Sequence, residues 1–460
     1  MNAPLRPAAN AVQAIHPDQA WLIQQAQAVL RGNWMGYATK PAPRLYPHQW
    51  SWDAAFIAIG YAHFDQDRAA QELRSLFHGQ WANGLLPHIV FNPAVTDYTP
   101  GPEFWRTDRS PHAPHAVRTS GIVQPPLHAT AIWHIYQVAQ DKERARGFLR
   151  EMFPRLVAWH TYLYRERDMR GDGLVYLRHP WESGQDNSPI WDRLLARITL
   201  RPDRVLPYRR VDSRIVDAAE RPSDAEYDRY AYLVRLAWEN DYDEARIRAV
   251  SPFLVEDVLF NALLVQANHD LGRIAREIGE DGSTFEAWAA RTAGAMNARQ
   301  WNDEHGIYFD HDLAMHAPIH AHVAAGFSPL FAGVPNDAQV RRMLDKLNAC
   351  GFCPLDATCW AVPSFDKQEP GYSSNRYWRG PVWINVNWLL YRGLRRYGFD
   401  DYAAHVRQAI VELPRRCGFY EYFDPDTGQG HGSDNFSWTA ALLLDVLLEE
   451  SDEERKTDGA

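Results

Sequence analysis

The chain has 460 residues, of which 46% are hydrophobic and 23% charged, and its formal net charge is -10. These are ordinary values for a globular protein with ample material for a core. They exclude a nucleic-acid partner, because no basic run offsets the negative charge, and a membrane partner, because no apolar run has spanning length.

Four cysteines, Cys350, Cys353, Cys359 and Cys417, are too few for a disulfide framework in a chain of this size. We interpret them as buried small hydrophobic residues in a reducing cytoplasm. The spacing of Cys350 and Cys353 is also that of half a zinc site or a redox pair, but the chain has no second CxxC pair. The first twenty residues lack the apolar region of a secretory signal, which also favours the cytoplasm.

Helical periodicity runs through the chain, and strand-like alternation is scarce. An all-α architecture is therefore predicted, with about eleven or twelve helices. A Ser251-Pro252 start signal precedes the apolar series Leu254, Val258, Ala262 and Val265. The other helices are expected over about 21–29, 52–64, 66–80, 126–138, 142–166, 283–301, 336–349, 389–394, 400–416 and 434–449.

Three similar turn segments, 168–174, 302–308 and 424–428, each follow a long predicted helix. Their acidic residues and glycines are typical of a tight turn that leads into a short extended piece. Recurrent units of this kind predict a toroid of paired helices whose loops gather at one end and line a pocket.

We expect one large domain over residues 18–450, after a flexible N-terminus (1–17) and before a charged tail (451–460). Segments at about 93–122 and 187–250 interrupt the helical pattern and are rich in proline, arginine and aromatic residues. Long interruptions in a compact domain are often functional lids. The sequence leaves the oligomeric state open, and a homo-oligomer is compatible with it.

Aromatic residues gather with acids or amides in four segments, 46–53, 181–192, 377–383 and 419–423. For any single tryptophan, a place in the core is the more common explanation. Together, however, the flat faces of Trp and Tyr and the hydroxyl-binding carboxylates suit a pyranose ring. The clusters therefore indicate sugar chemistry with a small-molecule partner.

Hydrolysis of a glycosidic bond needs a carboxylic acid and a second carboxylate across the ring. Asp186 and Glu421 are the predicted pair. Asp186 lies beside two tryptophans that are expected to raise its pKa, although Asp-Asn-Ser-Pro is also a helix-start pattern. Glu182 and Asp53 are the competitors, and Asp53 is alternatively suited to grip two sugar hydroxyls.

A histidine series, His316, His320 and His322, has ligand-like spacing. Pro318 would break the helix that aligns these side chains, so no metal site is predicted there.

Several sequence blocks, in this order, resemble glycoside hydrolase family 63, and within it the bacterial mannosylglycerate and glucosylglycerate hydrolases. The blocks are YPHQWSWDAAF, GLLPHIVFNP, GIVQPP, HPWESGQDNSPIWD, ERPSDAEYDRY, SSNRYWRGPVWINVNWLLYRGL, and GFYEYFDP followed by GHGSDNFSW. The resemblance covers most of residues 20–450. It implies an (α/α)6 barrel with inserted cap loops and an inverting mechanism that needs no metal or other cofactor.

The resemblance also implies roles for individual residues. Asp186 matches the general acid, and Glu421 matches the base that activates water. Positions that line the sugar subsite are matched by Tyr46, Trp50, Trp52, Asp53, Gln124, Trp181, Tyr377, Trp378, Gly380 and Trp383. Positions that hold the glycerate carboxylate are matched by Tyr98, Arg221 and Tyr227, and a planar guanidinium suits a carboxylate.

Position 434 departs from the family pattern, because an amide such as Gln is expected where this chain has Asp434. The exchange implies a change in which substrate hydroxyl is bound. Three alternatives remain open: a neutral α-glucosidase of the same barrel, a sugar epimerase that uses His48 and His431, and a glycan binder without activity. The inverting hypothesis predicts about 6.5–9.5 Å between the carboxyl groups of Asp186 and Glu421.

Overall fold

A closed ring of six helices forms the centre of the molecule. The computed structural model describes residues 17–457 apart from 209, 211, 213, 214, 356 and 358. Each helix of the ring packs against the next, and the last packs against the first. In ring order they are α2 (Ser51–Ala62), α5 (His128–Val138), α10 (Val258–Ile278), α12 (Pro329–Ala332), α14 (Ile384–Arg396) and α16 (Ser437–Thr457).

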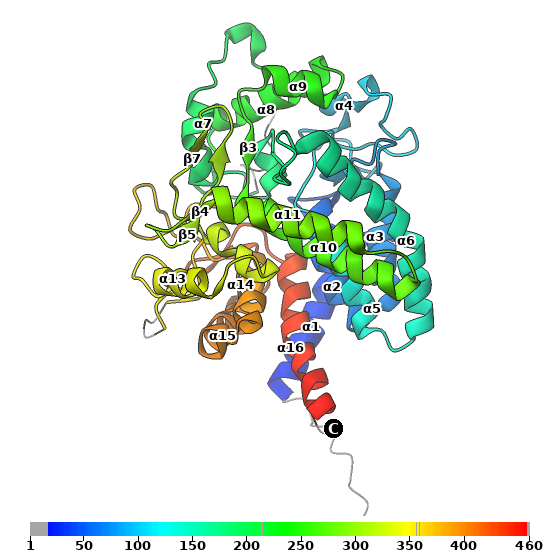
Figure 1. Ribbon diagram of the computed structural model, residues 1–460, viewed down its shortest axis with the longest axis vertical. Coiled ribbons are helices and arrows are strands. Elements are labelled where there is room, and N and C mark those ends of the chain that lie inside the picture. Colours follow the sequence, from blue (N-terminus) through cyan, green and yellow to red (C-terminus); the bar gives the residue numbers. More distant parts are fainter. Residues whose placement is uncertain are drawn as a thin grey trace, which may run out of the picture.

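An outer helix precedes each inner helix along the chain (Figure 1). The alternation of outer and inner helices makes the fold an (α/α)6 barrel, which confirms the predicted architecture. The outer helices are α1 (Pro17–Gly32), α3 (Gln66–His78), α6 (Lys142–Tyr162), α11 (Ser283–Arg299), α13 (Asp337–Leu347) and α15 (Asp400–Cys417).

The first inner helix, α2, is buried on every side. All twelve residues of α2 are buried, and a helix that is apolar all round is stable only in a core. α13, by contrast, is amphipathic and begins at Asn336, whose side chain accepts the backbone N–H of Gln339 while the Gln339 side chain accepts the N–H of Asn336. Such a reciprocal cap satisfies backbone donors that the first turn leaves free.

Two expected helix boundaries are wrong. The helix expected after Pro252 begins only at Val258, because residues 255–256 pair as a strand and the Asp257 carboxylate caps the helix by accepting the N–H of Phe260. At the other end of the chain, α16 continues to Thr457, beyond the expected end at 449. In the first of these places, strand pairing and the Asp257 cap override the apolar spacing.

Short antiparallel strands complete the loops. Two of the three predicted turn segments lie in the hairpins β4–β5 and β8–β9, and in the third Asp168 accepts the backbone N–H groups of Asp172 and Gly173. The strands are β1 (Gln49–Trp50), β2 (Ile89–Val90), β3 (Val255–Glu256), β4 (Trp301–Asn302), β5 (Ile307–Tyr308), β6 (His311–Asp312), β7 (Ala317–Pro318), β8 (Tyr422–Phe423) and β9 (Gly430–His431).

The two segments that interrupt the helical pattern lie together at one end of the barrel, at the top of Figure 1. Arg109 forms an ion pair of 2.8 Å with Asp241, and the guanidinium of Arg106 lies 4.6 Å from the Trp238 ring centroid, so the two insertions support each other. The second insertion consists largely of helices rather than of irregular loop. The insertions contain α4 (Pro102–Trp105), α7 (Asp192–Ala196), α8 (Asp224–Glu239) and α9 (Glu244–Val250).

The interpretation of the four cysteines as buried, reduced residues is wrong. Cys353 and Cys359 form a disulfide, and Cys350 and Cys417 are free and exposed. The six-residue separation in the loop after α13 brings the two Cα atoms to 6.0 Å, which is within the usual range for a disulfide. Counting cysteines could not detect one local cross-link.

Among the described residues, no helix is both long enough and apolar enough to cross a lipid bilayer.

Because α2 and α16 close the ring, we expect a larger residue at Gly60 to destabilise the protein. A Cβ at this position in α2 would overlap the backbone of Ala441 in α16. We therefore expect Gly60→Ala to lower the free energy of unfolding by about 1–3 kcal/mol, as overpacking does. Urea denaturation measures the change.

The matched control is Gly147→Ala in α6, where a new Cβ has no neighbour within 4 Å. Because alanine favours the helix, this variant should gain about 0.5–1 kcal/mol. Equal stability of the Gly60→Ala variant and the unsubstituted protein would contradict the tight α2–α16 contact.

Candidate active site

A cavity opens at the end of the barrel that carries the insertions. Its walls come from the loops before and after β1 and β2, from the first insertion, from the turn around Asp186 and from the start of the second insertion. The residues that line it are Leu45, Tyr46, Trp50, His88, Ile89, Tyr98, Thr99, Pro100, Trp181, Asp186, Asp212, Arg221, Pro222 and Tyr227. Seven predicted site residues are therefore brought together around one space.

Backbone contacts hold Asp186 in a tight turn. The Tyr230 hydroxyl donates to the Asp186 carbonyl at 2.6 Å. Two residues earlier, Gly184 has a positive φ of 72° and the Trp52 indole packs where a Cβ would lie, so only glycine fits. Burial, together with the charge of Glu421, raises the pKa of Asp186 to about 7, against the opposing effect of Arg221. The carboxyl group is therefore partly protonated at neutral pH.

Glu421 lies immediately before β8 and is 1% exposed. Its carboxylate accepts the Tyr46 hydroxyl at 2.7 Å and the Ser433 backbone N–H at 3.1 Å, and an Arg221 nitrogen lies 3.8 Å away. Burial raises the pKa of Glu421, while Arg221 and these two donors act against the rise. Each of the three contacts favours the ionised form.

Arg221 connects the two acids to the cavity. Its Nη2 donates to the Tyr46 hydroxyl at 3.2 Å, its Nε donates to Asp212 at 3.3 Å, and its guanidinium lies 4.0 Å from the Tyr377 ring centroid. Its Nη1 is buried and has no hydrogen-bond acceptor among the residues that the structure describes. Such a donor beside a cavity is suited to an anionic ligand.

Two tyrosine hydroxyls lie between the carboxyl groups. The Tyr46 hydroxyl, which donates to Glu421, is 3.4 Å from the Tyr377 hydroxyl. A hydrogen bond from Tyr377 in turn lowers the pKa of Asp186 against the rise that burial causes. This chain of short links connects the two carboxyl groups, and the separation of about 6.5–9.5 Å expected of an inverting pair stays a prediction.

Stacked indole rings pack against Tyr377, one of the residues of the site. Trp378 and Trp383 lie with ring centroids 3.7 Å apart and planes at 2°, and Trp52 lies 6.5 Å from Trp378. Gln124 accepts the Trp52 backbone N–H at 3.1 Å. At Gly380, φ is 154° and the Ser373 backbone occupies the place of a Cβ, which excludes other residues.

Asp53 and Glu182, the competing acids, have opposite environments. Burial raises the pKa of Asp53 well above its usual value, and the charges of Glu421 and Asp186 add to the rise, so Asp53 belongs to the same group of acids. Glu182 binds Arg167 at 3.0 Å and the Arg178 backbone N–H at 2.7 Å. These two arginines overcome the effect of burial and lower its pKa to about 2. Glu182 is thus a permanently ionised structural group and a poor proton donor.

Asp434 lies apart from the other predicted residues. Its side chain is 44% exposed, and one carboxylate oxygen is 3.5 Å from the exposed Arg44 guanidinium. A role for Asp434 in binding a substrate hydroxyl stays a prediction.

The histidines considered in the sequence have other surroundings. The buried His48 accepts the Asn92 backbone N–H, and burial lowers its pKa to about 4. His431 binds Glu220 at 3.1 Å. His316 is exposed in the β6–β7 turn, while His322 contacts His305 and Glu369. His320 and His322 both lie against the His305 ring, and among the described residues the three histidines of the series do not form a common ligand group.

Sequence reasoning missed three contributors. His88 lines the cavity and stacks on Trp181 with the planes at 10°, and Ser433 binds Glu421 through its backbone. His88 and Ser433 lie inside quoted sequence blocks, which could have indicated them. Asp212, the partner of Arg221, lies in a charge-rich insertion that carries no such signal. Asn385 was noticed only as a flanking amide, yet its buried amide has no partner within the described structure.

Comparison with known proteins decides the family. Residues 46–439 match the family described as the mannosylglycerate hydrolase MGH1-like glycoside hydrolase domain. The chain belongs to this family. It is 54% identical to the mannosylglycerate hydrolase of Rubrobacter radiotolerans, over 93% of this chain and 97% of the relative.

Two further relatives of this glycoside hydrolase have informative names. It is 39% identical to the glucosylglycerate hydrolase of Mycolicibacterium hassiacum, over 93% of this chain and 97% of that one. A crystal structure of the family 63 mannosylglycerate hydrolase from Thermus thermophilus, in complex with Tris and D-glycerate, superposes with a TM-score of 0.87. That enzyme is 44% identical, with 92% of this chain and 99% of that chain covered. The expectation of family 63 is confirmed, and the epimerase and non-catalytic alternatives are set aside.

Proposed function

We propose that this glycoside hydrolase cleaves mannosylglycerate or glucosylglycerate to the free sugar and glycerate with inversion at the anomeric carbon. The observation that carries the proposal is the arrangement of two acids and one cation: Asp186 and Arg221 line one cavity, and Glu421 is linked to them through the hydroxyls of Tyr46 and Tyr377 and lies 3.8 Å from Arg221. Arg221 also keeps a buried donor that no described residue accepts. The names of the relatives supply the two substrates.

Asp186 is the general acid and Glu421 the general base in this proposal. Asp186, with its pKa raised to about 7, keeps a proton that it gives to the glycosidic oxygen as that bond breaks. Glu421 is held as a carboxylate by Tyr46, Ser433 and Arg221. It takes a proton from a water molecule that attacks the anomeric carbon from the opposite face, so an α-glycoside releases a β-sugar.

The glycerate carboxylate is bound by Arg221 together with Tyr98 and Tyr227. Arg221 keeps a buried donor that has no acceptor in the described part of the chain, and both tyrosines line the cavity. A guanidinium and two phenols supply enough donors for the four lone pairs of a carboxylate that is removed from water. An exposed ion pair would contribute far less, because water screens it.

The sugar ring lies against the remaining predicted residues. Asp53 is available to its hydroxyls, as is the indole N–H of Trp378, which has no acceptor among the described residues. The other members of this proposed subsite are Tyr46, Trp50, Trp52, Gln124, Trp181, Tyr377, Gly380 and Trp383. Glucose and mannose differ in the orientation of one hydroxyl, so both glycosides belong in every assay.

Substitution of the two acids tests the proposal directly. We expect Asp186→Asn and Glu421→Gln each to reduce kcat on both glycosides by at least about 10²–10⁴-fold, because each loses one proton transfer. Proton NMR of the first-released sugar should show the β-anomer from the unsubstituted enzyme.

A glycosyl fluoride separates the two roles, because fluoride leaves without being protonated. Asp186→Asn should retain turnover on the fluoride, whereas Glu421→Gln should lose it on both substrates. Release of the α-anomer, or wild-type turnover of the two natural glycosides by either variant, would overturn the assignment.

The pH dependence follows from the two pKa shifts. Asp186 must be protonated, so kcat/KM should fall as the pH rises through about 7. Glu421 must be ionised, so kcat/KM should fall again as the pH decreases through its raised pKa. The measured values belong to the coupled pair. A profile that stays flat from about pH 6 to about pH 9 would contradict the role of Asp186 as the acid.

Tyr227→Phe and Tyr98→Phe test the binding of the carboxylate. Each removes one hydrogen bond to a charged group, worth about 1.5–3 kcal/mol, so KM for the anionic glycosides should rise about tenfold or more. KM for the matching neutral methyl α-glycoside should stay unchanged. Tyr232→Phe, on the same helix but beside Arg204, is the control and should alter neither. Equal losses on anionic and neutral substrates would favour the neutral α-glucosidase.

A further inference from the structure

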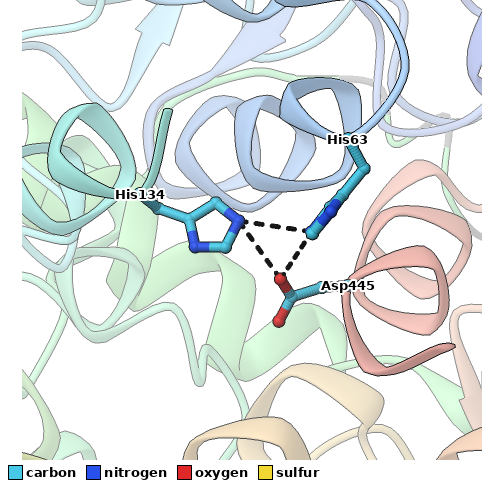
Figure 2. Close-up of side chains that lie close together, drawn as sticks. All are labelled: His63, His134 and Asp445. Atoms are coloured by element: carbon cyan, nitrogen blue, oxygen red, sulfur yellow. Dashed lines mark hydrogen bonds and ion pairs between the residues drawn. The ribbon is translucent and has the colours of Figure 1, made fainter. Parts of the chain in front are cut away.

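Three ligand-type side chains converge between the inner helices, away from the acids (Figure 2). His63 lies at the end of α2, His134 in α5 and Asp445 in α16. The Nε2 atoms of the two histidines are 3.3 Å apart and lie 2.8 Å and 3.2 Å from the same Asp445 oxygen. The side chains of His63, His134 and Asp445 are only 4%, 11% and 0% exposed. Among the described residues, this is the one group with such geometry.

The edges of this triangle have the length that a shared metal ion imposes. Nitrogen and oxygen ligands lie about 2.0–2.1 Å from a tetrahedral Zn²⁺, which puts any two of them about 3.3 Å apart. The same three atoms also lie within hydrogen-bond distance of one another, and the metal-binding test below separates the two explanations. Two imidazoles and a carboxylate are, in addition, a common ligand set for first-row divalent metals.

We propose that His63, His134 and Asp445 bind a divalent transition-metal ion, with Zn²⁺ as the best fit, at a structural site separate from the catalytic acids. The ion would tie α2, α5 and α16 together at the point where the barrel closes.

The Asp445 carboxylate is oriented for this role by contacts to its second oxygen. That oxygen accepts the Trp388 indole N–H at 2.8 Å and an Arg392 N–H at 3.1 Å, which leaves the first oxygen directed at the histidines. Contacts of this kind fix the ligands of metal sites.

A neighbouring cavity supplies the access and the remaining ligand. The cavity of about 410 Å³ is lined by His63, His134, Trp388 and Arg392 among others. A single water molecule needs only about 10–15 Å³. Water can therefore complete the coordination shell, and a hydrated ion can reach the site.

The position of the cluster argues for a structural role. Asp53 lies in the first turn of α2 and His63 follows the last, so ten residues of helix separate them by about 15 Å. The ion would thus act at the opposite end of α2 from the sugar subsite. Hydrolysis in the proposed mechanism passes through none of the three ligands, so the metal proposal stands or falls independently of the function.

The test uses the full-length protein, freed of metal by dialysis against a chelator, with Co²⁺ alone as the probe. We expect one equivalent of Co²⁺ to bind, to give visible absorption bands typical of nitrogen and oxygen ligands, and to be displaced by one equivalent of Zn²⁺. Zn²⁺ should also raise the Tm of the unsubstituted protein, because a ligand that binds only the folded state stabilises it.

His134→Gln and His63→Gln should weaken Co²⁺ binding more than about tenfold and abolish the rise in Tm. Glutamine still donates to Asp445, so these variants keep that hydrogen bond, and circular dichroism verifies that they fold. The matched control is His322→Gln, which alters the other histidine pair of the chain and should bind Co²⁺ unchanged. Absence of Co²⁺ uptake by the unsubstituted protein, or equal binding by folded His134→Gln, would overturn the proposal.

Discussion

The packing of α2 against α16 is the contact on which the rest of the molecule depends. It joins the first inner helix to the last and closes the ring, so that loops from both ends of the chain meet at one rim. Trp52 and Trp438, almost 400 residues apart in sequence, lie with ring centroids 5.3 Å apart. The same closure lets Tyr46 donate to Glu421. An open arrangement of the same helices would leave the two catalytic candidates unconnected.

Charge balance inside the rim gives neighbouring carboxylates opposite properties. Glu182 and Asp186 are four residues apart in one turn. Glu182 is fully buried, whereas Asp186 is partly exposed to the cavity. Two buried arginines, Arg167 and Arg178, hold Glu182 ionised, whereas Asp186 has only the influence of Arg221 and faces the charge of Glu421. One carboxylate therefore stabilises the turn and the other keeps a proton. The assignment of acid and base follows from these surroundings rather than from residue type.

The insertions add the function that the barrel lacks. The ring and its indoles form a surface suited to a sugar, and Arg221, which the second insertion contributes, brings a cation over Tyr377 and beside both acids. Because Arg221 contacts Tyr46 and lies near Glu421, the group proposed to bind the anionic end of the substrate also influences the catalytic pair. In the proposed mechanism, recognition of the glycerate and activation of the bond are therefore coupled through Arg221.

The sequence determined the helical architecture and the number of barrel helices to within one, because apolar spacing and turn residues are visible along the chain. The aromatic and acidic clusters also indicated Asp186 and Glu421, whereas most other residues of the rim were predicted from the resemblance of whole sequence blocks to a known family. The short inner helix α12, the late start of α10 and the disulfide at Cys353 escaped, because each depends on contacts or on geometry that no local pattern encodes.

Only the tertiary structure decided which acids are charged and which distant residues form a site. Glu182 and Asp186 are equivalent in sequence until their arginine partners are placed, and nothing along the chain associates His63, His134 and Asp445. Spacing predicts a site when its members share one helix or loop. When a site takes one residue from each of three helices, only the packing of those helices brings the residues together. The spacing of residues along the sequence therefore does not predict such a site.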